Sequence, residues 1–238
     1  MLSVVIIAKD EADRVGAALA SVAGLAEEVV VLDSGSTDET VAVAEAAGAV
    51  VLRTDWPGFV AQKNRGLAAA AGDWVLSLDA DEALTPELAR SIRVALGSPT
   101  AAGYVVRRQT IWLGHALRHG AAYPDARVRL VRRDAARWVG VDPHDRLEVA
   151  GPTPTLAGDL LHRPYRDLGE HLATIDRYTA LDARAGGWSD VLLRPPWAFF
   201  RDFVLRGGFR DGWPGFAFAA LGATYTALKW SRAHWGRR

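Results

Sequence analysis

The sequence contains no cysteine among its 238 residues. This excludes a disulfide framework, thiolate chemistry and a metal site built on cysteine. A GxGxxG motif is also absent, so a dinucleotide-dependent dehydrogenase loses its main support, and the absence of GxxxxGK[ST] counts against a P-loop enzyme. Hydrophobic residues make up 50% of the chain, which is enough for one large domain or for a domain with an appendage.

Net charge is zero, but the charged side chains are unevenly distributed along the chain. Residues 1–100 carry 7 basic and 15 acidic side chains, whereas residues 101–238 carry 21 basic and 13 acidic ones. The positive excess of the second part suggests an anionic partner, such as a phosphate-bearing substrate or a lipid surface. The alternative is that the two halves pack on each other and match their charges internally.

The first hundred residues alternate between strand-like and helix-like patterns. Apolar runs predict strands at residues 2–8, 28–32, 50–53 and 73–78. Helices are expected after each strand, the first capped by Asp10, the second opened by the capping-box spacing of Ser36 and Glu39, and the fourth capped by Thr85. Four βα units in sequence predict an α/β fold with a parallel, doubly wound sheet and helices on both faces.

From about residue 103 the pattern becomes more irregular. Strands are predicted at residues 104–112, 126–131 and 159–162, which makes the sheet mixed, and helical spacing runs over residues 168–185. Residues 188–238 hold five of the nine tryptophans, and the longest uncharged stretch there, residues 212–228, falls short of the roughly 20 residues of a spanning helix. We expect an Arg- and Trp-rich amphipathic segment at a membrane interface; a helical appendage on the core, or an oligomer contact, is the alternative.

Polar residues follow three of the predicted strands directly. They are Lys9, Asp10 and Glu11 after the first strand, Asp33 and Ser36 after the second, and Asp79, Asp81 and Glu82 after the fourth. Ligands bind beyond the carboxyl ends of strands in open parallel sheets, so these residues are expected to converge on one crevice. Carboxylates spaced as in Asp79 and Asp81 suit Mg²⁺ or Mn²⁺, which leaves further positions to water and phosphate oxygens. A solvated strand end is the alternative.

The stretch VVLDSGSTDET places Asp33 between an apolar strand and a tight turn at Gly35. A carboxylate there could accept hydrogen bonds from a nucleotide base or from ribose hydroxyls, and the following helix N-terminus favours anions. The alternative is that Ser36 and its neighbours only cap that helix.

Three segments in this order, SVVIIAKDE, VVLDSGSTDET and GFVAQKNRGLAAAAGDWVLSLDADE, resemble the family-2 inverting glycosyltransferases with a GT-A type fold. The later stretches LRHGAAYPDARVRLVRR, VDPHDRL and LLHRPYRDL are similar to the bacterial branch that includes lipopolysaccharide-core β-1,4-glucosyltransferases. The resemblance implies a catalytic domain over residues 1–165 and a helical appendage over residues 166–238. Residues 1–100 would be its Rossmann-like nucleotide-sugar-binding half, and residues 101–165 the acceptor-side half.

The resemblance also implies roles for single residues. Asp33 would read the base, Lys63 and Asn64 would line the donor site, Asp79 would lie near ribose and metal, and Asp81 would bind the metal directly. Lys9, Glu11 and Ser36 are expected to line the same nucleotide-sugar site. The catalytic base of this branch is often written His-Glu, and the matching residues here are His144 and Asp145. The shorter Asp145 departs from that pattern; it could be a turn residue after Pro143, with Glu148 or Asp142 next as the base.

An inverting transfer is a single displacement in which a base takes the proton of the acceptor hydroxyl and a metal offsets the charge that develops on the leaving diphosphate. No nucleophilic side chain is needed. Arg127 and Arg129 alternate on one predicted strand and would hold an acceptor phosphate or face solvent. His162 ends an apolar run and would approach the metal or acceptor, or else be a core histidine.

The resulting prediction is a glycosyltransferase that depends on Mg²⁺ or Mn²⁺ and uses a nucleotide-sugar, expected to be a UDP-sugar. The acceptor would be a saccharide that is lipid-linked or part of a lipopolysaccharide core. The chain would be cytoplasmic, would bind the anionic cytoplasmic face of the inner membrane through its C-terminal segment, and would not bind nucleic acid; an oligomer is possible. Alternatives are a catalytically silent membrane-surface module on a transferase-like fold, and a HAD-like phosphatase, which usually carries D-x-D on its first strand.

Overall fold

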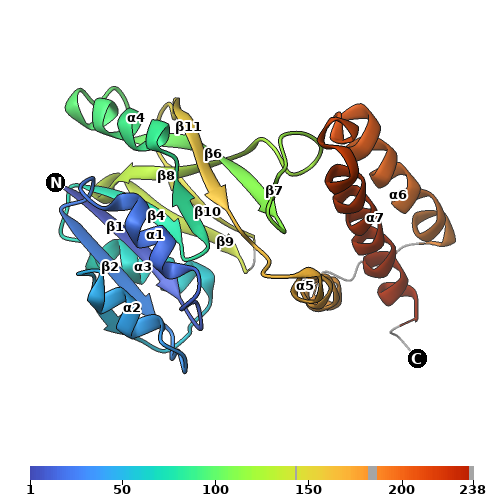
Figure 1. The fold of residues 1–238 in the computed structure, drawn as a ribbon, viewed down its shortest axis with the longest axis horizontal. Coiled ribbons are helices and arrows are strands. Elements are labelled where there is room, and N and C mark those ends of the chain that lie inside the picture. Colours follow the sequence, from blue (N-terminus) through green and yellow to red (C-terminus); the bar gives the residue numbers. More distant parts are fainter. Residues whose placement is uncertain (143, 182–186, 236–238) are drawn as a thin grey trace. The chain divides into compact units, whose positions relative to one another are not determined.

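The computed structural model describes residues 1–142, 144–181 and 187–235, with side chains described as far as residue 232. The chain divides into two compact units (Figure 1). The first, called the sheet unit here, comprises Met1–Arg108 and Asp125–His162, and the second, the helical unit, comprises Gln109–Pro124 and Arg163–Arg238. The predicted helical residues 182–185 lie outside the described part of the chain.

Four parallel strands form the first half of the main sheet. In spatial order they are β3 (Val50–Arg53), β2 (Glu28–Asp33), β1 (Leu2–Ala8) and β4 (Trp74–Asp79). The register pairs Ala8 with Asp33 and Ile7 with Asp79, so β1, β2 and β4 end at the same edge of the sheet. The predicted parallel, doubly wound arrangement is confirmed.

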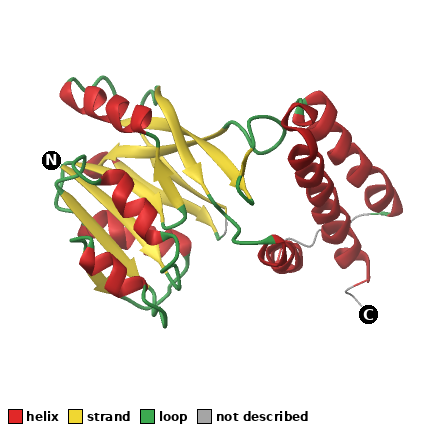
Figure 2. Cartoon of the chain, in the orientation of Figure 1, coloured by secondary structure: helices red, strands yellow, loops and turns green. Residues whose placement is uncertain are grey.

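Helices cover both faces of this sheet (Figure 2). The buried side chains of α1 (Val15–Val22), α2 (Thr40–Ala46) and α4 (Pro86–Gly97) share one core with β1 and β4. On the other face, α3 (Phe59–Ala69) shares a second core with β1 and β2. Thr85 caps α4 as predicted, since its hydroxyl accepts a hydrogen bond from the Leu88 N–H at 3.3 Å.

Two predicted helix caps are wrong. The Asp10 carboxylate does not cap α1; it accepts a hydrogen bond from the Thr37 N–H at 2.8 Å. The capping box of Ser36 and Glu39 does not form either, because the Ser36 hydroxyl accepts from the Asp10 N–H at 2.9 Å and α2 starts only at Thr40. These side chains instead join the loop after β1 to the loop after β2.

Antiparallel strand pairs make up much of the second half of the sheet, so the whole sheet is mixed, as expected. It continues with β8 (Asp125–Arg132), β6 (Gly103–Trp112), β11 (Thr155–His162) and β5 (Glu82–Leu84), while β7 (His115–Ala116) pairs with β6. A short 3₁₀ turn, η1 (Arg133–Ala135), leads into a hairpin of β9 (Ala136–Val141) and β10 (His144–Val149). The sequence patterns did not predict this hairpin or β5.

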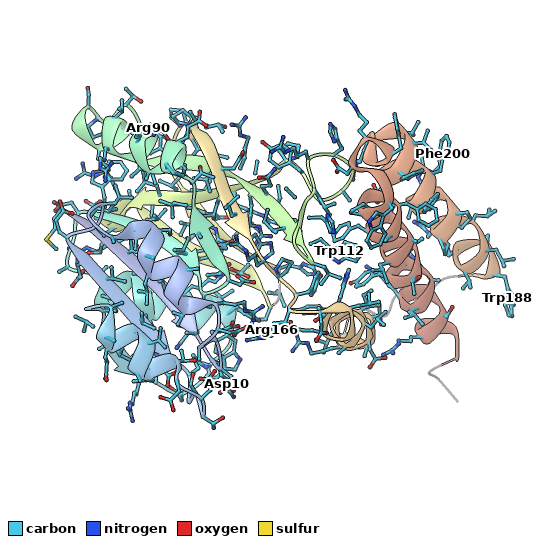
Figure 3. All side chains as sticks on the ribbon, in the orientation of Figure 1. Asp10, Arg90, Trp112, Arg166, Trp188 and Phe200 are labelled. Carbon is cyan, nitrogen blue, oxygen red and sulfur yellow. The ribbon has the colours of Figure 1, made fainter. Side chains whose placement is uncertain are left out.

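The helical unit is built from α5 (Leu168–Leu181), α6 (Trp188–Phe200), the π-helical turn η2 (Arg201–Leu205), the 3₁₀ turn η3 (Gly208–Asp211) and α7 (Gly212–Trp235). Trp112 lies in its small core with Leu117, Phe218 and Leu221 (Figure 3). The predicted helical appendage is present. Among the described residues, no helix combines the length and apolar character needed to cross a membrane.

Candidate active site

The candidate site lies at the carboxyl ends of β1, β2 and β4, within the sheet unit. Asp33, the last residue of β2, is 3% exposed, and its carboxylate accepts hydrogen bonds from the N–H groups of Gly35 and Ser36 at 3.2 Å. Gly35 has a φ of +82°, which favours glycine and turns the chain sharply back over the strand end. The predicted turn after Asp33 is therefore present.

Asp33 and Ser36 border a cavity of about 430 Å³. Its other lining residues are Gly35, Asp38, Val41, Arg53, Thr54 and Asp55. The cavity is large enough for a small ligand of the size that protein pockets usually hold. Carboxylate, hydroxyl and guanidinium groups around one opening suit a ligand that carries both hydrogen-bond donors and an anionic group.

Two other predicted residues of the first strand end lie near this loop system. The Glu11 N–H donates to the Thr40 hydroxyl at 2.7 Å, and the Glu11 carboxylate is bonded to Arg14 at 2.5 Å. Lys9 is exposed. Glu11 therefore supports the loop geometry through α1 and α2, while Lys9 presents its ammonium to solvent.

Helix α3 carries three consecutive polar residues that contact three different elements. Gln62, fully buried, donates to the hydroxyls of Ser34 and Thr54 at 3.0 and 2.6 Å. Asn64 exchanges two hydrogen bonds with the backbone of Trp138, both at 2.9 Å. Asn64 thus fixes β9 against α3, and Gln62, which sequence reasoning did not include among the site residues, fixes α3 against the loop after β2.

Lys63 lies at the centre of the candidate site. Its ammonium nitrogen is 2.8 Å from a carboxylate oxygen of Asp145 on β10 and 3.4 Å from one of Asp79 at the end of β4. It also lies 4.5 Å from the ring centroid of Trp138, a distance typical of a cation–π contact. The structure thus brings Lys63, Asp79 and Asp145 together from three segments that are distant in the sequence.

Asp79 also contacts a second cationic side chain, that of Arg129. Arg129, 3% exposed on β8, donates to Asp79 at 2.7 Å and to Glu82 at 2.8 Å. Glu82 also accepts from the Asp79 N–H at 2.9 Å and from Arg108 at 3.2 Å. Buried charges persist in proteins when they are paired and hydrogen-bonded in this way, so the network holds the backbone of the 79–82 turn in one conformation.

The pKa values follow from these contacts. Burial alone would raise the pKa of Asp79, but the charges of Arg129 and Lys63 outweigh it and hold that pKa below its usual range. Burial raises the pKa of Glu82, with a further contribution from the neighbouring Asp79 charge. Asp79 is consequently an anion near neutral pH, and it lies among cations.

Arg127 and Arg129 differ in their surroundings although they alternate on one strand. Arg129 is buried in the network described above, whereas Arg127 is half exposed and bonded to Asp125 at 2.8 Å. Asp125 also binds Arg108 at 2.5 Å. Of the two predicted acceptor contacts, only Arg127 presents its guanidinium to solvent.

Asp81 and His162 form the remaining pair. The Nε2 atom of His162, at the end of β11, is 3.3 Å from a carboxylate oxygen of Asp81. The Nδ1 atom of His162 is buried and has no hydrogen-bond partner within the described residues. Those residues include no cluster of three or more His, Asp or Glu side chains arranged to hold a metal ion by themselves. The predicted ligand pair is also divided, since Asp79 binds Arg129 and Lys63 while Asp81 faces His162.

Asp142 has a structural partner at the start of α3. Its carboxylate oxygens accept from the N–H groups of Phe59 and Val60 at 2.9 and 3.2 Å, which satisfies two orphan donors of the first helical turn. Glu148 is bonded to Arg146 at 2.6 Å on the hairpin. Of the three acidic residues considered as a base, Asp145 is the one in contact with Lys63.

A profile described as "Glycosyl transferase family 2" matches residues 3–131, which is more than half of the chain. The chain belongs to this family. This membership confirms the resemblance seen in the sequence, together with the GT-A type α/β fold expected from it, and favours that interpretation over a HAD-like phosphatase.

Curated glycosyltransferases are similar to the chain over different lengths. The lipopolysaccharide core biosynthesis glycosyltransferase LpsC of Rhizobium meliloti is 28% identical over 242 aligned positions, which cover 95% of this chain and 89% of LpsC. An uncharacterized glycosyltransferase of Rickettsia felis is 40% identical over 114 residues, 48% of this chain. The chain spans only 28% to 40% of the length of the first curated relatives it matches.

Among solved structures, this family-2 chain is similar to glucosyl-3-phosphoglycerate synthase from Mycobacterium tuberculosis. That enzyme was crystallised with Mn²⁺, UDP and glucosyl-3-phosphoglycerate. The two are 24% identical, the match covers 76% of this chain and 78% of the other, and the TM-score is 0.49.

Proposed function

We propose that the chain transfers a sugar from a UDP-sugar to a saccharide acceptor with inversion at the anomeric carbon, assisted by a divalent metal. The observation that carries this proposal is the convergence of Lys63, Asp79 and Asp145 at the carboxyl edge of the sheet. This is the edge where ligands bind in open α/β sheets. Membership of glycosyl transferase family 2 supplies the reaction class.

The donor nucleotide would occupy the cavity beside Asp33. The buried Asp33 carboxylate would accept hydrogen bonds from the base, and Ser36 would contribute a hydroxyl at the rim. Lys9 and Glu11 would flank the same loops, with Asn64 holding the neighbouring wall. Lys63 would contact the diphosphate, since a lysine ammonium binds phosphate as a point charge.

The residues around Asp81 fit a divalent cation. Mg²⁺ and similar ions are commonly bound by one or two carboxylates, with water and substrate phosphate oxygens completing the shell. Asp81 would supply the direct carboxylate, Asp79 would lie close to it, and His162 could add a ring nitrogen, which Mn²⁺ also accepts. When bound, such a cation stabilises the negative charge that develops on the departing diphosphate.

Asp145 would act as the general base. The acceptor hydroxyl oxygen forms a bond to the anomeric carbon while the bond from that carbon to the diphosphate oxygen breaks. The hydroxyl proton passes to Asp145, and the nucleoside diphosphate departs with the bonding electrons. A single displacement of this kind inverts the anomeric configuration and requires no side-chain nucleophile.

The acceptor would be a saccharide that carries negative charge or a lipid anchor. The exposed guanidinium of Arg127 could bind an acceptor phosphate, whereas the buried Arg129 would fix the position of the Asp79 carboxylate through their ion pair. The similarity to LpsC, a lipopolysaccharide core biosynthesis glycosyltransferase, over most of both chains supports an acceptor from the lipopolysaccharide core. The proposed place of this reaction is the cytoplasmic face of the inner membrane. Contact with that membrane would come from the C-terminal segment.

The test is a product assay. The chain is incubated with Mn²⁺, a panel of UDP-sugars and a deacylated lipopolysaccharide-core saccharide, and products are detected by mass spectrometry and their anomeric configuration by NMR. We expect a glycosylated product of inverted configuration with one donor. Nucleotide binding without product from any donor would favour a catalytically silent module that retains the transferase fold.

A further inference from the structure

The helical unit carries a stripe of large apolar side chains that nothing in the described part of the chain covers. Leu193, Trp197, Phe200 and Val204 are between 42% and 66% exposed. Their spacing of four, three and four residues places them on one face of the continuous helical segment formed by α6 and η2. On the opposite side of this segment, Ala198 and Asp202 are buried. The stripe is therefore the outer face of α6 and η2.

Basic side chains flank the stripe. Arg194 and Arg201 follow Leu193 and Phe200 by one residue each, so both lie along the same edge of the stripe. Their side chains are 53% and 41% exposed although each pairs with an aspartate. Long arginine side chains of this kind can extend to an aqueous interface while their stems rest on apolar surface.

A cluster of arginines lies at the end of the stripe. The carboxylates there are almost fully buried: Asp202, 9% exposed, is shared by Arg201 and Arg206, and Asp211, 7% exposed, accepts from the N–H groups of Arg118 and His119. Arg118 and Arg210 are exposed, and neither forms an ion pair with a carboxylate among the described residues. The acids are thus turned inward and the guanidinium groups outward, which leaves this end of the surface positive.

We propose that this surface docks on an anionic lipid bilayer. It is defined by the stripe Leu193, Trp197, Phe200 and Val204 together with Arg118, Arg206 and Arg210. Trp, Phe and Leu side chains would enter the interfacial region, and the arginines would bind lipid phosphate groups. The inference deepens the membrane contact suggested under the proposed function, and it does not depend on the chemistry at Asp145.

Charge favours a bilayer over a second copy of the chain. Residues 187–235 carry six basic and three acidic side chains, and the acids are ion-paired or buried. A two-fold interface uses the same patch on both copies, so a second copy would add more arginines to the buried surface and no unpaired carboxylate to bind them. Anionic headgroups supply the missing negative charge instead.

The absence of cysteine makes a direct test possible. The substitution Val204→Cys provides a unique site for an environment-sensitive fluorophore, and Val94→Cys on the exposed face of α4 in the sheet unit provides a matched control. Each labelled chain is titrated with vesicles of phosphatidylcholine alone and with added phosphatidylglycerol. We expect a blue shift at position 204 with the anionic vesicles, weaker at high salt, and none at position 94.

Paired variants test both parts of the surface by vesicle co-sedimentation. Leu193→Ser with Trp197→Ser should lower the partition coefficient by about tenfold or more, because large apolar side chains leave the interface. Arg118→Gln with Arg210→Gln should remove most of the preference for anionic vesicles. The control pair, Arg90→Gln with Val94→Ser, changes exposed residues one turn apart on α4 (Figure 3 labels Arg90) and should bind like the parent.

Two results would overturn the proposal. One is equal vesicle binding by the parent and both surface variants. The other is lipid-independent dimerisation in sedimentation velocity that the Leu193→Ser and Trp197→Ser pair abolishes, which would assign the surface to a second copy. UDP binding is measured on every variant without vesicles; loss of nucleotide binding in the parent alongside intact vesicle binding would refute the proposed transferase function and leave this inference standing.

Discussion

The ammonium nitrogen of Lys63 lies 2.8 Å from a carboxylate oxygen of Asp145, and the same nitrogen lies 3.4 Å from Asp79. While the Lys63 ammonium occupies that carboxylate oxygen, an acceptor hydroxyl cannot approach it, and another anion is needed to bind the ammonium in its place. The diphosphate of a donor would be such an anion. We therefore expect donor binding to draw Lys63 away from Asp145 and to free the base for the acceptor hydroxyl.

The first prediction concerns Lys63 itself. Lys63→Met should weaken UDP binding by about 10- to 100-fold, because a charge-assisted contact contributes roughly 1.5–3 kcal/mol. Isothermal titration calorimetry measures the change, with an unfolding curve to show that the fold is retained. Lys229→Met, which removes an ammonium near Tyr225 on α7, is the matched control and should bind UDP like the parent. Unchanged affinity in Lys63→Met would remove this residue from the donor site.

The second prediction concerns the base. Asp145→Asn keeps a hydrogen-bond acceptor for Lys63 but loses the carboxylate, so transfer should slow by at least about 100-fold while UDP binding is retained. Initial rates of UDP release with saturating donor and acceptor measure the effect. A fully active variant would place the base elsewhere, and Glu148 would then be tested before Asp142, whose carboxylate caps α3.

The third prediction concerns the metal. Asp81→Asn should abolish transfer and remove the dependence of UDP binding on Mn²⁺, because the direct carboxylate ligand is lost. His162→Gln should weaken the metal dependence without abolishing it. Calorimetric titration of UDP into each variant, with and without Mn²⁺, measures both effects. A normal metal dependence in Asp81→Asn would refute the assignment of that residue.

The fourth prediction concerns pH and lies in the helical unit. His171 accepts a hydrogen bond from the Trp112 ring at 3.1 Å, and burial lowers its pKa to about 4. The His171 side chain therefore binds a proton near pH 6.5 in the unfolded state, but only near pH 4 in the folded state. The stability contributed by neutral His171 is fully present above pH 6.5 and is lost as the pH falls from 6.5 towards 4.

Urea unfolding at pH 7 and pH 5 measures this loss. The parent should lose about 1–2 kcal/mol more on acidification than His171→Gln, which keeps an acceptor for Trp112 but does not titrate. Equal pH dependence of the free energy of unfolding in both proteins would contradict the burial of a neutral histidine.

Several features of the sheet unit were predictable because local sequence determines them. The apolar runs of β1, β2 and β4 and the Thr85-Pro86 start of α4 have few alternative structures. The caps assigned to Asp10 and Ser36 were wrong for a physical reason: short polar side chains can bond to any nearby N–H, and here a neighbouring loop supplied one.

Long-range contacts were not predictable in the same way. Arg129 contacts Asp79 although the two residues are 50 positions apart in the sequence. Arg129 also binds Glu82, which is therefore part of a buried network, whereas a solvated turn residue was the local alternative. The capping role of Asp142 depends on a hairpin folding against α3, and one sequence pattern cannot report that. α6 also continues through Pro195 and Pro196, where local propensity favours a break.

The most direct test of the central claim is calorimetric binding of UDP to the purified chain, with and without Mn²⁺. The account predicts tight binding that depends on the metal, because Asp33 and Lys63 recognise the nucleotide while Asp81 holds the cation against the diphosphate. Failure to bind UDP under either condition, together with failure to bind GDP, ADP or dTDP, would contradict the proposal that this edge of the sheet is a nucleotide-sugar site.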